Sequence, residues 1–121
     1  MIKKDDIIQN FKTAIASTIK SLSKKEKVEV VFGNEKNKAQ TDVIFLPDLN
    51  KENKINFLKI RALADSESLK LRFSDKKIYK IFEPKGSISR ELYRIAEKIR
   101  YEVLGSKEFK GIKKNLQNYN N

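Results

Sequence analysis

Polar side chains recur at helical spacing in the segment RALADSESLKLRFSD, residues 61–75, and they hold most of the chemistry that this sequence offers. Their three- and four-residue spacing places them along one line of a helix, as Arg61, Asp65, Ser68 and Arg72. This set suits an ion pair that fixes a helix crossing, an anion or partner site built around arginines, or general acid/base chemistry at Asp65. We favour the ion pair, because no second carboxylate has a spacing that suggests a catalytic pair.

Apolar residues flank this polar line on both sides. Phe57, Ile60, Ala64 and Leu71 fall on one side of the predicted helix, and the other side has Leu58, Ala62, Leu69 and Phe73. A helix packed on both flanks would bury the polar line or make it the floor of a groove, where charges need partners. We therefore expect Asp65 within salt-bridge distance of Arg61 or Arg100, in an architectural pair.

The composition limits the kinds of site that the chain can build. It has 121 residues, the size of a single domain spanning 1–121, and it contains no cysteine and no histidine. Disulfides, thiol nucleophiles, Cys/His zinc sites and Ser-His catalysis are thereby excluded. No aspartate cluster has calcium-loop spacing, so we predict no metal site. No segment has the length of a signal peptide core or membrane span, which makes a cytoplasmic location the default expectation.

The net charge of +11 raises nucleic-acid binding as an alternative function. Lysine and arginine are spread over the whole chain, however, without a run of five like charges or aromatic residues interleaved with a basic cluster. A basic, solvated surface is therefore the stronger interpretation.

The apolar patterns predict a mainly helical α+β fold, with four helices packed against a short two-stranded β-hairpin. Helices are expected over 5–22, 51–74, 87–104 and 107–119, and strands over 28–32 and 43–46. Asn50 and Ser87 are candidate caps for the second and third helices. A competing interpretation makes 69–73 a strand paired with 78–82, because Leu69, Leu71 and Phe73 alternate with polar residues.

The third predicted helix has the clearest one-sided pattern in the sequence. Its apolar face consists of Ile88, Leu92, Ile95, Ala96, Ile99 and Val103, and we expect that face to lie in the core. Gly105 follows it and is expected to end the helix as a left-handed cap.

Several of these residues also belong to a longer pattern that resembles the amino-terminal region of the CobT family. The pattern comprises Arg61, Ala64-Asp65-Ser66, Leu69-Lys70-Leu71, Asp75, Pro84, Gly86, Glu97, Arg100, Glu102 and Gly105. The opening FKTAIASTIKSL, with VEVVF and LPDL, also resembles the start of that family. Ala62 replaces a frequent glycine, and Ser74 stands where the family often has a histidine.

The resemblance implies a subunit of the ATP-dependent cobaltochelatase, which inserts cobalt into hydrogenobyrinic acid a,c-diamide in aerobic cobalamin biosynthesis. It implies a CobS-type AAA+ ATPase and a CobN-type large subunit as partners. ATP, magnesium and cobalt would be used by the whole complex, with no cofactor in this domain. The family's carboxy-terminal von Willebrand A-type domain is absent from this sequence. The expected role is a non-catalytic assembly or adaptor domain, with Arg61, Asp65, Ser68, Arg72, Asp75, Glu97 and Arg100 as structural or partner-contact residues.

Overall fold

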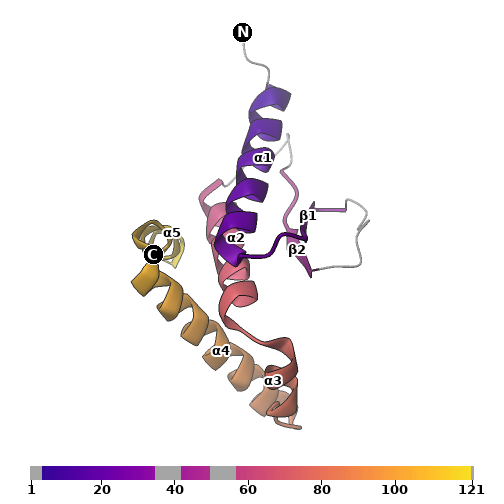
Figure 1. Cartoon of the computed structure of the whole chain (residues 1–121), viewed down its shortest axis with the longest axis vertical. Helices are drawn as coiled ribbons and strands as arrows, with labels where there is room; N and C mark the ends of the chain where they lie inside the picture. The colour runs from indigo at the N-terminus through magenta and orange to yellow at the C-terminus, as the bar shows by residue number, and fades with distance from the viewer. Residues whose placement is uncertain (1–3, 35–41, 50–56, 121) are drawn as a thin grey trace.

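The computed structural model describes residues 4–34, 42–49 and 57–120, and within them the chain is mainly helical (Figure 1). The elements follow the order α1 (Lys4–Ser23), β1 (Val28–Phe32), β2 (Asp42–Leu46), α2 (Phe57–Phe73), α3 (Lys76–Ile81), α4 (Ser87–Glu108) and α5 (Lys110–Asn120). The predicted α+β class is confirmed. Asn50 and the first residues of the predicted 51–74 helix lie outside the described ranges.

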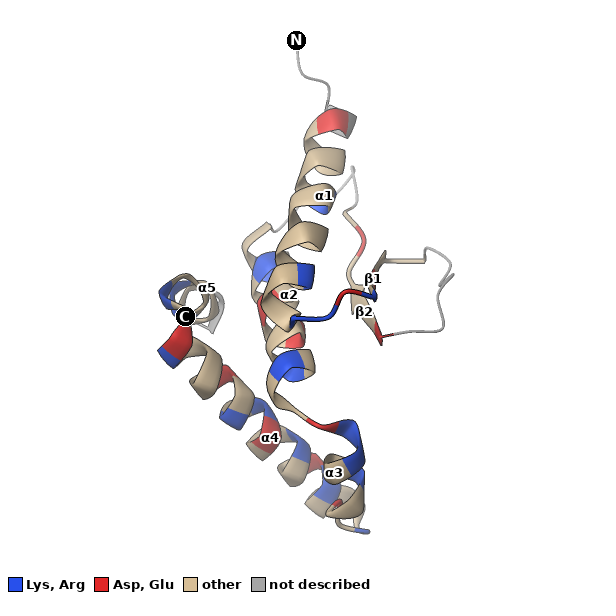
Figure 2. Cartoon of the chain, in the orientation of Figure 1, with Lys and Arg blue, Asp and Glu red and all other residues tan. Residues whose placement is uncertain are grey.

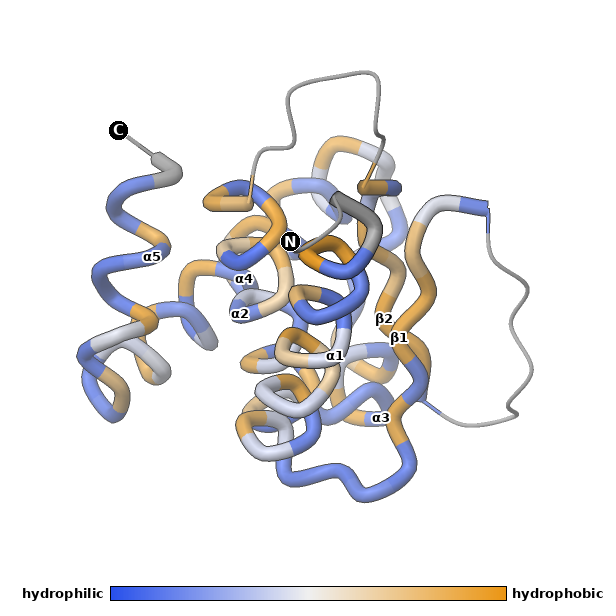
Figure 3. The backbone as a smooth tube through the Cα atoms, turned by 90° about the horizontal axis from the view of Figure 1, so that it is seen from above, coloured by the Kyte–Doolittle hydropathy of each residue, from blue (hydrophilic) through white to orange (hydrophobic). Residues whose placement is uncertain are grey.

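Helix α2 is the central element, with packing partners on two sides. The strands lie on one side of α2 and α5 on the other, while α1 runs beside α2 (Figure 1 and Figure 3). One core cluster joins α2 to α1 and the strands, and it includes Ile60, Ala64, Ile19 and Ile44. A second joins α2 to the α4–α5 pair, and its members are Leu22, Ala62, Leu69, Tyr101, Ile112 and Leu116.

This division confirms the two apolar flanks predicted for the long helix. Phe57 and Leu71 pack on the first cluster, and Phe73 packs on the second. Leu58 is the exception, because its side chain is exposed. Between the flanks, Asp65 and Ser68 are buried, as a polar line between two packed surfaces must be.

The two strands are parallel, so the predicted hairpin is wrong. Val28 pairs with Asp42 and Phe32 with Leu46, which aligns the two strands in the same direction. Gly33, in a left-handed conformation with φ of 59°, donates its backbone N–H to the Leu46 carbonyl at 2.8 Å. The end of β1 therefore lies beside the end of β2. Both strands then present buried residues to the helices, as parallel strands usually do.

A fifth helix, α3, occupies the segment that the competing interpretation assigned to a returning strand. Helix α2 continues to Phe73, and α3 begins after Asp75, whose side chain accepts hydrogen bonds from the backbone N–H groups of Lys77 and Ile78. An aspartate N-cap of this kind satisfies donors that a short helix leaves unpaired. The prediction of four helices missed this element, because it is only six residues long.

Helix α4 corrects three expectations. It passes through Gly105 and ends at Glu108, so Gly105 is not a left-handed cap. Its N-cap is Gly86 rather than Ser87, which is the first helical residue. Most importantly, its one-sided apolar face is exposed to solvent instead of lying in the core. The buried side of α4 carries Tyr101 and Gly105, because only the small Gly105 lets α4 approach the buried Leu69 of α2 closely.

Candidate functional site

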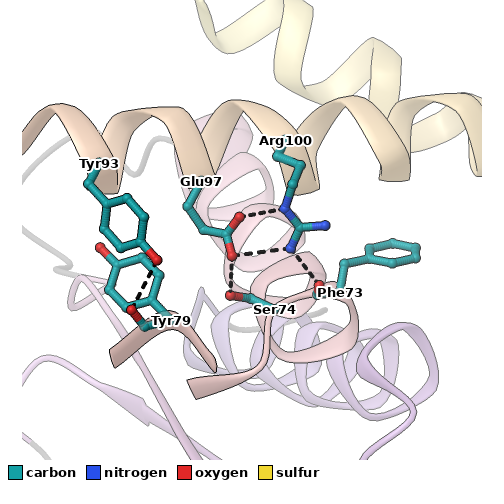
Figure 4. Close-up of polar contacts among 6 residues, drawn as sticks. All are labelled: Phe73, Ser74, Tyr79, Tyr93, Glu97 and Arg100. Atoms are coloured by element: carbon teal, nitrogen blue, oxygen red, sulfur yellow. Dashed lines mark hydrogen bonds and ion pairs between the residues drawn. The ribbon is translucent and has the colours of Figure 1, made fainter. Parts of the chain in front are cut away.

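A polar joint connects the end of α2 to the middle of α4 (Figure 4). Glu97 accepts a hydrogen bond from the Ser74 hydroxyl at 2.7 Å and pairs with the Arg100 guanidinium through Oε1 and Oε2. Arg100 also donates to the Phe73 carbonyl at 2.7 Å, which is one of the carbonyls left without a partner at the end of α2. Two of the predicted residues, Glu97 and Arg100, are thus brought together here, and Ser74 joins them as a hydroxyl donor.

The contacts of the joint shift the pKa values of Glu97 and Arg100 in opposite directions. Hydrogen bonding from Arg100 lowers the pKa of the Glu97 carboxyl below its ordinary 4.5, with a further contribution from the Ser74 hydroxyl, although partial burial acts against it. The same pairing raises the pKa of Arg100. The joint is therefore strongest with Glu97 ionised.

Glu97→Gln is expected to lower the free energy of unfolding at neutral pH by roughly 0.5–1.5 kcal/mol, because the amide is a weaker partner for Arg100. Since the folded-state pKa of Glu97 is lowered, its contribution is present above pH 4.5 and is lost as the pH falls through the lowered value. Denaturant unfolding from neutral to acidic pH should therefore show the variant and the wild type converging in acid.

Glu91→Gln is the matched control for that prediction. Glu91 pairs with Arg94 three residues later on the same helix, and both side chains are more than half exposed. Because this pair joins no two elements, its loss should leave the melting temperature unchanged. An equal response from both variants would contradict a joint role for Glu97.

Two tyrosines hold α3 against the start of α4. The rings of Tyr79 and Tyr93 lie 4.5 Å apart, and the Tyr93 hydroxyl donates to the Tyr79 carbonyl at 3.0 Å (Figure 4). Asp75, the α3 cap, is exposed and takes no part in the Glu97 joint. The joint and the tyrosine pair together set the direction in which α4 leaves α2.

Asp65 has a different partner from the one predicted. Its Oδ2 atom accepts a hydrogen bond from the Asn115 amide of α5 at 2.8 Å. Among the described residues, no arginine lies within ion-pair distance of Asp65, because Arg61 points to solvent and Arg100 serves the Glu97 joint. The predicted salt bridge is wrong, although Asp65 does lie at a contact between helices.

Burial raises the pKa of Asp65 above its ordinary 3.8, while the Asn115 hydrogen bond and the Arg61 charge act in the opposite direction. A raised folded-state pKa means that the ionised group disfavours the fold as the pH rises through and above 3.8. Asparagine keeps a carbonyl acceptor for Asn115 without that charge.

At neutral pH, the free energy of unfolding of Asp65→Asn is therefore expected to be higher than that of the wild type, or equal to it within about 0.5 kcal/mol. Its advantage should shrink below pH 3.8, where Asp65 is neutral in both states. Asp65→Ala should lose roughly 1–3 kcal/mol, because it leaves the Asn115 amide without an acceptor. Equilibrium unfolding of both variants tests this; a similar large loss in Asp65→Asn would show that the charge itself is needed.

A second contact between α2 and α4 lies beside Asp65. The Ser66 hydroxyl donates to Glu102 across the helix crossing. Tyr101, next to Glu102, is buried, and that burial raises its pKa to about 12. Ser66 and Glu102, two residues of the sequence pattern, are thus used to join helices.

Arg72 connects α2 to the ends of α1 and α4. It donates to the Leu22 carbonyl at the end of α1 at 3.2 Å and pairs with Glu108 at the end of α4 at 2.8 Å. Its guanidinium also lies 5.0 Å from the Phe109 ring centroid and 5.3 Å from that of Phe73. A planar guanidinium suits this position, because it can stack and donate in several directions at once.

The remaining members of the stripe do not converge on a shared site. Ser68 is fully buried and donates to the Ala64 carbonyl within its own helix at 2.7 Å, while Arg61 is exposed. An open depression of about 490 Å³ adjoins Arg72, Ser74 and Asp75, but all three side chains there already have partners within the chain. The arrangement supports helix packing rather than an anion site or acid/base chemistry at Asp65.

The surface charges follow no single stripe. Lysine or arginine occurs on every helix; acidic residues accompany them on α1, α2 and α4, whereas α3 and α5 carry basic residues without acidic ones (Figure 2). Within the described ranges, no cluster of acidic side chains could hold a metal ion. No helix there is long and apolar enough to cross a membrane.

Sequence patterns did not reveal the partners of Asp65, Ser66 and Ser74. Asn115 lies 50 residues after Asp65 and Glu102 lies 36 after Ser66, so no local spacing signals either pair. Only the sequence pattern shared with CobT marked Ser66 and Glu102 together.

These contacts define a mainly helical fold whose polar side chains join α2 to its neighbours. The family model of the cobalamin biosynthesis protein CobT matches residues 5–121. The chain belongs to the CobT family, which places it in cobalamin biosynthesis. No solved structure matches the fold.

Proposed function

We propose that this chain is a non-catalytic assembly domain of the ATP-dependent cobaltochelatase that inserts cobalt into hydrogenobyrinic acid a,c-diamide. Membership of the CobT family supports the pathway. The assembly role rests on how the chain uses its patterned polar residues. Asp65, Ser66, Arg72, Glu97 and Arg100 contact neighbouring helices, whereas catalytic groups converge on an accessible cavity.

The proposed partners are a CobS-type AAA+ ATPase and a CobN-type large subunit. ATP and magnesium would act at the ATPase, and cobalt would enter the tetrapyrrole at the large subunit. This division leaves the present chain with binding and positioning, for which a well-packed helical frame is suited.

The test is direct binding of the purified chain to each purified partner, measured separately by pull-down and by interferometry. We expect retention by at least one of them, and binding to neither would contradict the proposal. A net charge of +11 attracts acidic surfaces without specificity, so each measurement is repeated at raised salt. Immobilised duplex DNA is the control surface, because purely electrostatic binding to it should fall steeply as salt rises.

A further inference from the structure

The side of α4 that faces away from α2 carries an exposed apolar seam, formed by Ile88, Leu92, Ile95 and Ile99. Their exposed fractions are 77%, 63%, 40% and 58%, although each is a large aliphatic residue. Nine of the twelve large hydrophobic residues exposed in the described ranges lie between Ile78 and Leu104. Helix α4 also runs along the lower left edge of the molecule in Figure 1. An apolar surface concentrated in this way marks a binding face.

The seam has the spacing of a two-helix contact. Its members are separated by four, three and four residues, the alternation of core positions in a coiled coil. Glu102 takes the next core position but bonds to Ser66 of α2, so the seam ends at Ile99. The partner of such a seam is another helix with matching length and charges.

We infer that the seam binds the α4 seam of a second copy of this chain, with the two helices antiparallel. A two-fold axis between Tyr93 and Arg94 places Ile88 opposite Ile99 of the second copy, and Leu92 opposite Ile95. All four apolar layers are then filled, and each copy presents the same residues, as a two-fold interface requires.

Charges beside the seam agree with this register. Glu91 and Lys98 lie on the same flank, seven residues apart, so the antiparallel arrangement places Glu91 near Lys98 of the second copy, twice. Within the chain, Glu91 pairs with Arg94 and Lys98 approaches Glu102 at 4.0 Å. The Glu91 and Lys98 side chains remain at least half exposed, and each can add a partner across the interface. The opposite flank has the small residues Ser89 and Ala96, which permit close approach.

The charge of α4 itself favours a second copy over an acidic partner. The helix contains five basic and four acidic residues, whereas the whole chain carries +11. A face selected for an acidic surface or nucleic acid would gather the excess positive charge, and α4 does not.

The two ends of α4 differ in a complementary way. Beside its start, Ile81 and Phe82 of the α3 segment are exposed. Beside its end, Ile99, Val103 and Leu116 line an open groove of about 320 Å³ between α4 and α5. An antiparallel pair brings each start to the other copy's end. Four aliphatic layers make a small interface, so we expect a dissociation constant of roughly micromolar magnitude.

Sedimentation equilibrium of the full chain at physiological ionic strength, from about 1 to about 300 μM, tests self-association. We expect a monomer–dimer equilibrium in the wild type and a monomer for Leu92→Glu, which places a carboxylate in the seam. Thr13→Glu, an exposed change on α1, is the control and should associate like the wild type. A wild type that stays monomeric, or a Leu92→Glu chain that still dimerises, overturns the inference.

Charge reversal tests the antiparallel register. Lys98→Glu should weaken dimerisation at least several-fold by placing two carboxylates together, and Glu91→Lys should weaken it by placing two ammonium groups together. The double reversal should restore most of the affinity. Circular dichroism of each monomer controls for changes in helix content. Dimers insensitive to these changes, or a double reversal that fails to restore association, would exclude this register.

The outcome is independent of the proposed cobaltochelatase role, because self-association needs no other subunit. A monomeric wild type whose capture by the ATPase or large subunit is abolished by Leu92→Glu would assign the seam to that subunit. That result overturns the dimer and supports the assembly role. A dimer that binds neither subunit would support the self-association and contradict the assembly role.

Discussion

Leu69→Ala is expected to lower the free energy of unfolding by about 2–5 kcal/mol, a large share of the stability of a small domain. Leu69 is fully buried on α2, in the cluster that joins this helix to α4 and α5. Alanine would remove apolar contacts and leave a cavity at the closest approach of α2 and α4. Urea unfolding followed by circular dichroism measures the change.

Ile99→Ala is the matched control, and its expected result reverses the prediction from the helical pattern. If Ile99 lay in the core, Ile99→Ala would lower the free energy of unfolding about as much as Leu69→Ala. The Ile99 side chain is 58% exposed, however. At concentrations where the chain is monomeric, we expect a change within about 0.5 kcal/mol. A loss of several kcal/mol in the monomer would show that α4 packs its apolar face inward.

Gly105→Ala should destabilise the chain by about 1–3 kcal/mol, although alanine normally favours a helix. A Cβ atom at this position would overlap Cγ and both methyl groups of Leu69. Leu69 is fully buried, and close packing limits the movement of its side chain, so the added methyl group should push α4 away from α2. Thermal and urea unfolding should both report the loss.

Gly111→Ala is expected to change the free energy of unfolding in the opposite direction. Apart from its chain neighbours and the backbone of its own helix, no atom lies within 4 Å of a Cβ built at Gly111, which is exposed on α5. Alanine there should raise the free energy of unfolding by roughly 0.5–1 kcal/mol, from helix propensity and the reduced entropy of the unfolded chain. If both glycine variants were stabilised, close packing of Gly105 would be disproved.

Residue spacing was sufficient to predict four of the five described helices and the two packed flanks of α2. It also identified the buried polar line, because Asp65 and Ser68 lie between Ile60 and Leu69 on a helix with apolar residues on both sides. Periodicity is local, and an α-helix converts it directly into faces. The three- and four-residue spacing of Leu92, Ile95 and Ile99 likewise established that α4 has one apolar side.

What covers each face was decided only by tertiary structure. The same periodicity marks a core face and an exposed face, so the helical pattern could not distinguish the seam of α4 from the buried side of α2. Tyr101 and Gly105 occupy the buried side of α4 because Gly105 permits contact with Leu69.

The sequence by itself determined the mainly helical class, the two-sided packing of α2 and the resemblance to CobT, all of which follow from residue types in order along the chain. Tertiary structure decided the parallel pairing of β1 and β2, the bonding of Asp65 to Asn115 and the outward direction of the α4 face. Each of these depends on which distant segments meet. That choice minimises the free energy of the whole packed chain, so it leaves no signature in the spacing of any single segment.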